Sequence, residues 1–119
     1  MTFSIEEANA LLASLEPLLK SLRDAHSVME TLHDDVMASI PTNGGGAVHR
    51  EFAEASREVA RAAKAIAEMG VLVRDPSSGL VDFPSVRDGE EVFLCWRLGE
   101  ESVGWWHPTD TGFAGRLPL

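Results

Sequence analysis

The 119-residue sequence has one cysteine, no tyrosine and few basic side chains. The single thiol, Cys95, cannot form an intrachain disulfide or supply the several thiolates of a cysteine-rich zinc site. Ten Lys and Arg against 19 Asp and Glu give a formal charge of −9, so the positive field that binds phosphate is missing. We therefore expect neither a nucleic acid nor a membrane surface as a partner.

Long apolar runs are also missing. No stretch of about 18 apolar residues occurs, so we predict no membrane-spanning helix. The first ten residues, MTFSIEEANA, lack the basic and apolar regions of a secretory signal, and we expect a cytoplasmic protein. Hydrophobic residues make up 45% of the chain, which is typical of a globular protein and not of a disordered one.

The composition changes at Gly70. Thirteen of the 14 alanines precede Gly70, whereas six of the eight aromatic residues follow it. Alanine favours helices, and aromatic residues separated by glycines favour strands and turns. We predict an α+β fold in which a helical hairpin over residues 1–69 precedes a small antiparallel β subdomain over 70–119. Both parts should belong to one folding unit.

The first half predicts a long antiparallel two-helix hairpin that resembles a coiled coil. Ser4 and Glu7 fit a capping box, and the apolar residues that follow recur in steps of four and three. Pro17 should kink this first helix, which the segment 40–46 should end. The second helix should span about residues 47–69.

The two predicted helices differ in length, at roughly 54 and 35 Å by the rise per residue. The surplus of the first helix must cover either the C-terminal half or a second copy of the chain. A two-helix hairpin buries little surface alone, so we favour a homodimer with a four-helix core over a monomer closed by its own sheet. The function that follows most directly is a dimeric interaction or scaffold module.

The second half predicts short strands separated by turns. Alternating or β-branched segments indicate strands over 71–74, 80–83, 92–98 and 103–107. Pro84 should end the second strand, and the Arg87–Glu90 segment with its Asp-Gly pair should form a tight turn.

The side chains with most capacity for chemistry cluster in this second half. Cys95, His107 and Asp110, joined by Asp82, supply the thiolate, imidazole and carboxylate ligands of a Zn or Fe site with an open position. In one alternative Cys95 is a small buried apolar residue and His107 bonds to Asp110. In another, Cys95 is a nucleophile with His107 as its base. The sequence leaves these alternatives, and hence an enzymatic role, open.

The register of the last hairpin tests the metal hypothesis. A turn of two or four residues near Gly99 pairs Cys95 with Trp106 and leaves Cys95 and His107 on opposite faces. A three-residue turn or a bulge places Cys95 directly opposite His107. The metal site requires the second register.

A further hypothesis is a pocket for a small anionic ligand, because guanidinium groups bind carboxylate or phosphate through paired hydrogen bonds. The arginines that would form it are Arg87, Arg97 and Arg116. Alternatively, these arginines pair with acidic residues inside the fold. Candidate aromatic contacts are Trp96, Trp105 and Trp106. Because Trp105 and Trp106 are adjacent, they should point to opposite faces of a strand.

Several strings of the sequence resemble a known family. They are FSIEEANALL (3–12), GV (70–71), GLVDFP (79–84), RDG (87–89), VFLCWRLGE (92–100), WH (106–107) and GFAGR (112–116), with Asp110. On these strings the chain resembles a family of small bacterial proteins catalogued as domain of unknown function 2203. The resemblance covers nearly the whole chain and implies the same division of the fold in a bacterial cytoplasm. It supplies no reaction, but the family pattern includes Asp82, Arg87, Cys95, His107, Asp110 and Arg116.

Overall fold

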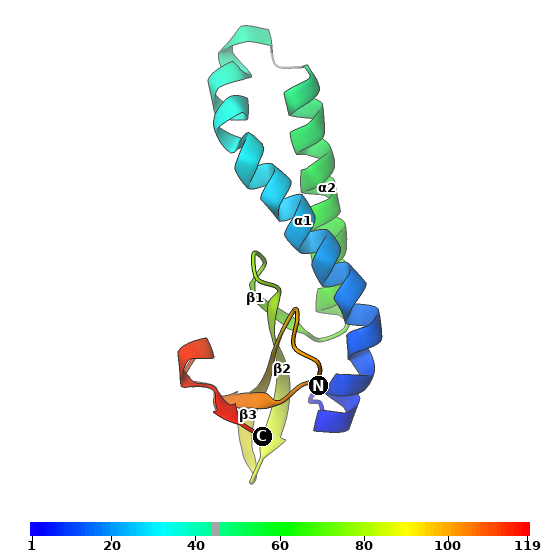
Figure 1. The fold of residues 1–119 in the computed structure, drawn as a ribbon, viewed down its shortest axis with the longest axis vertical. Coiled ribbons are helices and arrows are strands. Elements are labelled where there is room, and N and C mark those ends of the chain that lie inside the picture. The colour runs from blue at the N-terminus through cyan, green and yellow to red at the C-terminus, as the bar shows by residue number, and fades with distance from the viewer. Residues whose placement is uncertain (44–45) are drawn as a thin grey trace.

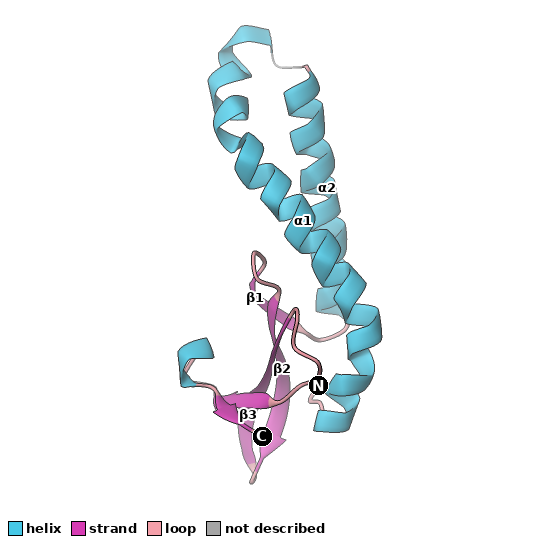
Figure 2. Ribbon diagram, in the orientation of Figure 1, coloured by secondary structure: helices cyan, strands magenta, loops and turns pink. Residues whose placement is uncertain are grey.

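The computed structural model of the protein describes residues 1–43 and 46–119. Its elements are α1 (Ile5–Asn43), α2 (Ala47–Glu68), β1 (Leu72–Asp75), β2 (Leu80–Arg87), β3 (Glu90–Arg97), β4 (Trp105–Pro108), the 3₁₀ helix η1 (Phe113–Gly115) and β5 (Leu117–Pro118). The helices form a hairpin, and the five strands form one antiparallel sheet in chain order (Figures 1 and 2). The predicted α+β fold is confirmed.

The start of α1 is the predicted capping box. The Ser4 hydroxyl accepts a hydrogen bond from the Glu7 backbone N–H at 3.0 Å, and the Glu7 carboxylate accepts one from the Ser4 N–H at 2.9 Å. The helix then continues without interruption through Pro17. The observed end of α1 at Asn43 lies within the segment 40–46 that was predicted to end it. A proline gives up only its own N–H bond, so two more helical residues can follow Pro41.

Gly44 and Gly45 of the predicted stop segment 40–46 lie outside the described residues. The end of α2 is as predicted. Gly70 has a φ of +84°, the left-handed conformation that ends a helix, and its N–H donates to the Ala67 carbonyl at 2.9 Å.

Strand β2 is longer than predicted because Pro84 does not end it. Strand β1 pairs with β2 only from Leu80 to Asp82, so the missing N–H of Pro84 faces no β1 partner. The Phe3 N–H instead donates to the Pro84 carbonyl at 2.7 Å. The predicted Asp-Gly turn between β2 and β3 is confirmed, with φ of +52° and +79° at its two central residues. We did not predict η1 or β5.

One hydrophobic core joins the helices to the sheet. Leu15 and Leu19 of α1 and Ile66 of α2 are completely buried together with Phe83 and Trp96 of the sheet. The sheet therefore covers the end of the hairpin at which α1 begins and α2 ends. The other end, which we call the distal part, extends beyond the sheet along the 59 Å axis of the molecule (Figure 1). A second copy is not needed to complete this core, so the homodimer remains a prediction.

The sheet separates two chemically different faces. Side chains alternate along each strand, so Val81, Phe83 and Trp96 face the helices. Asp82 and Cys95, each one residue out of step with these, face the other side. We call this second side the outer face. In the described part of the chain, no helix has the length and apolar character needed to cross a membrane.

Candidate functional site

The register of three strands brings Asp82, Cys95 and His107 onto the outer face. Asp82 of β2 is directly opposite Cys95 of β3. Cys95 is in turn opposite Trp105 of β4, and His107 is opposite Phe93. This pairing differs from both registers that we considered. Cys95 and His107 share a face, but they are two positions out of line and not directly opposite each other.

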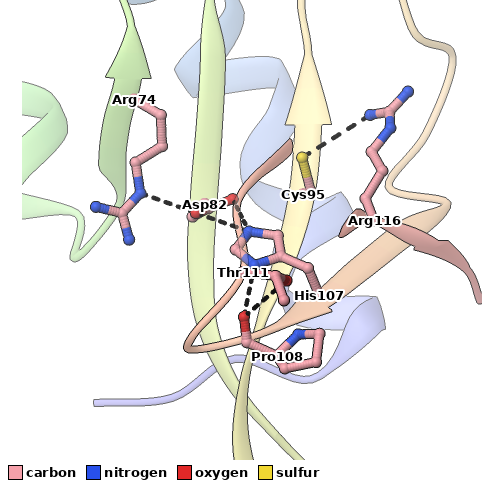
Figure 3. A network of polar contacts seen from close by, with 7 residues as sticks. All are labelled: Arg74, Asp82, Cys95, His107, Pro108, Thr111 and Arg116. Atoms are coloured by element: carbon pink, nitrogen blue, oxygen red, sulfur yellow. Dashed lines mark hydrogen bonds and ion pairs between the residues drawn. The ribbon is translucent and has the colours of Figure 1, made fainter. Parts of the chain in front are cut away.

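Asp82 and His107 form a buried pair. The His107 Nε2 atom lies 3.0 Å from each Asp82 carboxylate oxygen, and Nδ1 lies 2.8 Å from the Pro108 carbonyl oxygen (Figure 3). Each side chain is only 3% exposed. Since both ring nitrogens face oxygen acceptors, a ring that carries both protons satisfies every hydrogen-bonding group as an imidazolium against a carboxylate. The expected bond between His107 and Asp110 is replaced by this pair.

Arg74 adds a second cation to the same carboxylate. Its Nε atom donates to Asp82 at 2.8 Å, and its guanidinium lies 4.9 Å from the centre of the Phe93 ring. Unlike Asp82, the Arg74 side chain is 44% exposed, and its terminal nitrogens point away from Asp82 (Figure 3). Sequence reasoning missed Arg74. Pairing opposite charges across the predicted hairpin of β1 and β2 would have found it.

The Cys95 thiol belongs to a different set of contacts. Arg116 donates to the Cys95 sulfur at 3.8 Å and to the Glu100 carboxylate at 2.7 Å. Burial raises the pKa of the Cys95 thiol, although the Arg116 hydrogen bond opposes that shift. The thiol therefore stays protonated at neutral pH, which disfavours the nucleophilic role because the thiolate is the reactive form.

The predicted metal ligands are not assembled. Asp110 is exposed in the turn after β4, away from the buried Asp82–His107 pair. Among residues 1–43 and 46–119, no group of three or more His, Cys, Asp or Glu side chains is placed to hold a metal ion. His107 is also fully engaged, since one ring nitrogen faces a carboxylate and the other faces a carbonyl oxygen.

The predicted anion pocket is assembled only in part. Arg97 and Arg116 meet at Phe113, with their guanidinium carbons 5.1 and 4.4 Å from its ring centre. Arg87 lies elsewhere. It stacks on Trp106 at 4.7 Å, and Trp106 packs against the hydrophobic core on the face toward the helices. The structure therefore separates Arg87 from the other two arginines.

The three tryptophans have different environments. Trp96 is 1% exposed in the core, where its indole N–H donates to the Glu100 carbonyl at 3.1 Å, so it is not a surface contact. Trp105 and Trp106 are each partly buried and face opposite sides of the sheet. Trp105 lies on the outer face beneath the Arg116 guanidinium, 4.5 Å away.

A pocket of about 340 Å³ opens beside the buried pair on the outer face. It is lined by Arg74, Leu80, Asp82, Cys95, His107, Thr109, Thr111, Gly112 and Phe113. The polar groups in its wall are a buried carboxylate, an imidazole, a thiol and an arginine with free terminal nitrogens. Such a wall suits a small polar ligand, since binding sites combine a concave surface with a few fixed polar groups.

The arginines of the outer face lie close to its pocket. Arg74, Arg97 and Arg116 share this face with the carboxylates of Asp82, Glu91 and Glu100, so the charges of the face balance. In a chain of charge −9 this gathers three of the ten basic side chains on one face.

Fold and site together define a small α+β protein, in which a helical hairpin backs a five-stranded sheet with a polar pocket on its other face. Residues 1–119 match the family described as "Uncharacterized conserved protein (DUF2203)", and the chain belongs to this family. The resemblance noted in the sequence is thereby confirmed. No curated protein and no solved structure matches the chain.

Proposed function

We propose that the protein binds a small anionic molecule, a carboxylate or a phosphate, in the pocket beside Asp82 and His107. Arg74 is the principal anion-binding residue. The observation that carries this proposal is the 2.8 Å hydrogen bond from Nε of this pocket-lining arginine to Asp82, which leaves both terminal nitrogens of the guanidinium directed away from that carboxylate (Figure 3). Two parallel N–H groups are the geometry that recognises a carboxylate or phosphate.

The aromatic rings support this role. Every arginine after Gly70 lies over an aromatic ring, within 5.1 Å of a ring centre; the four are Arg74, Arg87, Arg97 and Arg116. Stacking holds the guanidinium plane without using its N–H groups, so these groups remain available in that plane. A ligand at Arg74 would meet a side chain whose ordering entropy is already partly lost.

Thermal unfolding with added anions tests the proposal. Sodium phosphate and sodium succinate are compared with sodium chloride at equal ionic strength, so that general screening is held constant. A ligand that binds the folded state raises the unfolding temperature, and above its Kd the gain in stability grows with the logarithm of its concentration, to about 2.7 kcal/mol at 100 times the Kd. We expect such a rise for at least one of the two anions.

Two arginine variants provide the comparison. Arg74→Ala should abolish the rise, whereas Arg87→Ala should keep it, because Arg87 stacks on a ring at the opposite face of the sheet. A response that is flat for both anions, or equal in the two variants, contradicts an anion site at Arg74.

A second candidate function is the homodimeric interaction module predicted from the sequence. It is favoured by the distal part of the hairpin, which extends beyond the sheet (Figure 1). There Met29, Leu32 and Phe52, which belong to the apolar residues spaced in steps of three and four along the helices, are only partly buried; we call them the seam residues. A second hairpin packed against these side chains would remove them from water and complete a four-helix core.

Light scattering at micromolar concentration decides this candidate. A homodimer has twice the 12.9 kDa mass of the chain, and Phe52→Gln should convert it to a folded monomer. Arg57→Gln, on an exposed position of the same helix, serves as the control and should remain dimeric. A mass of 12.9 kDa for the unmodified protein rules the dimer out.

A further inference from the structure

The helix hairpin contains a hollow of about 470 Å³ between its two helices. Its floor is formed by Ala25 and Val28 of α1 and by Ala55 of α2, with Ser21 at one end. Both alanines are 8% exposed, and their small side chains leave the space open. We call this hollow the helix groove.

The helix groove opens away from the sheet. Val28 follows the core residue Leu19 by nine positions, which is two and a half helical turns, so their side chains project from opposite sides of α1. The groove is therefore separate from the anion pocket, which lies on the far side of the sheet. No described residue of the sheet lines it.

Four carboxylates surround the groove. They are Asp24 of α1 and Glu51, Glu54 and Glu58 of α2. Asp24 pairs with Arg23 at 3.0 Å, and Glu58 pairs with Arg61, whose hydrogen bond lowers the pKa of the glutamate. Glu51 and Glu54 have no ion-pair partner among the described residues.

This charge decides between two occupants of the apolar floor. A second copy docked by twofold symmetry would bring the unpaired Glu51 and Glu54 carboxylates of both copies into one interface, because a symmetric interface pairs one patch with its own copy. Like charges placed opposite each other disfavour that arrangement strongly. A helix with small apolar side chains on one face and Lys or Arg beside them would instead fill the floor and neutralise the rim.

We propose that the helix groove is the docking site for a basic amphipathic helix of a partner protein. The apolar face of that helix lies on Ala25, Val28 and Ala55, and its basic side chains meet Glu51 and Glu54. This surface is separate from the proposed anion pocket, but it adjoins Met29 and Phe52, so a partner helix and a second hairpin compete for neighbouring positions.

Peptide binding to the whole protein tests the proposal. The probe is a fluorescein-labelled, amidated helical peptide of about 15 residues, roughly four turns, with Ala and Leu on one face and Lys on the flanks. A peptide of the same composition in scrambled order keeps the charge but has no apolar face. We expect the amphipathic peptide to bind in a salt-sensitive way and the scrambled peptide to bind much more weakly.

Matched variants locate the site. Glu51→Gln with Glu54→Gln should weaken binding about fivefold or more, since each removed pair contributes up to about 1 kcal/mol. Glu30→Gln with Glu68→Gln removes the same charge from exposed positions outside the groove and should have little effect. Ser21→Phe fills the hollow with every carboxylate retained, and it should also block the peptide.

Amide chemical-shift changes give an independent readout in this 12.9 kDa protein. They should be concentrated in residues 21–28 and 51–58. The proposal is overturned if the two glutamate pairs weaken binding equally, if Ser21→Phe binds normally, or if the shifts lie elsewhere. It is also overturned if no binding is seen with about 0.1 mM peptide, a concentration at which even a complex with a Kd of about 0.1 mM is half formed.

Discussion

Replacing Asp82 by alanine should destabilise the protein strongly through its effect on His107. The carboxylate lies 3.0 Å from His107 Nε2 and 2.8 Å from Arg74 Nε, so one substitution removes the hydrogen-bond partner of two side chains. The consequences for the two partners differ. The His107 side chain is only 3% exposed, whereas the Arg74 side chain is 44% exposed and can turn outward.

The expected magnitude follows from that difference in exposure. Removing one member of a buried ion pair typically costs about 3–5 kcal/mol, because the other charge is left buried and unpaired. The Arg74 contribution is screened by solvent, so Arg74→Ala should cost about 1 kcal/mol or less. A chain of 119 residues has a total stability of roughly 6–18 kcal/mol by the per-residue average. Asp82→Ala should therefore remove a large fraction of the stability.

Urea unfolding followed by tryptophan fluorescence measures both variants, since the completely buried Trp96 reports on the core. A double variant, Asp82→Ala with His107→Phe, removes the unpaired imidazole and should recover most of the lost stability. The reasoning is refuted if Asp82→Ala costs no more than Arg74→Ala, or if the double variant is less stable than Asp82→Ala alone.

Three further substitutions or reactions test local features. Cys95 should react with a disulfide reagent on the order of 100-fold more slowly in the folded protein than in urea, and rapid labelling of the folded protein would contradict its burial. Because burial raises the pKa of the thiol in the folded state, the stability that Cys95 contributes is present at low pH and is lost as pH rises through that pKa. Gly79→Ala should cost about 2 kcal/mol or more of stability in urea unfolding, since φ at Gly79 is +69° and the added carbon overlaps Leu98. Gly89→Ala should cost only about 1 kcal/mol, because Gly89 has a similar φ of +79° but lies in open space. Equal losses in the two variants would show that Leu98 moves freely. Pro17→Ala should raise the free energy of unfolding by up to about 3 kcal/mol, and with it the urea midpoint, because alanine restores a helical N–H. A lower midpoint would show that α1 is adapted to proline.

The helical half could be predicted from the sequence because its signals are local. The capping box needs only Ser4 and Glu7, and the apolar steps of four and three repeat over many turns of α1. The end of α1 at Asn43 falls inside the segment 40–46, which contains one proline and three glycines. The sequence could not place the end more finely, because one proline removes only one backbone hydrogen bond.

The site could be predicted only by residue type. Asp82, Cys95 and His107 were named, but their contacts depend on pairings between strands that no local pattern determines. The loop between β3 and β4 gives a register two positions away from the one that a metal site needs. With that offset, the His107 ring lies against Asp82, and the Cys95 sulfur instead accepts a hydrogen bond from Arg116.

The total charge of −9 predicts solubility, but it conceals how the charges are distributed in space. Residues 1–69 carry a charge of −5 and residues 70–119 a charge of −4, which by itself indicates an even spread. The fold instead gathers three stacked arginines on the outer face of the sheet and four carboxylates around the helix groove on the opposite side. Because fields act over about 8–10 Å at physiological salt, each site attracts ligands by the charges nearest to it and not by the sum. One acidic protein can therefore offer an anion site and a site for a basic helix at once.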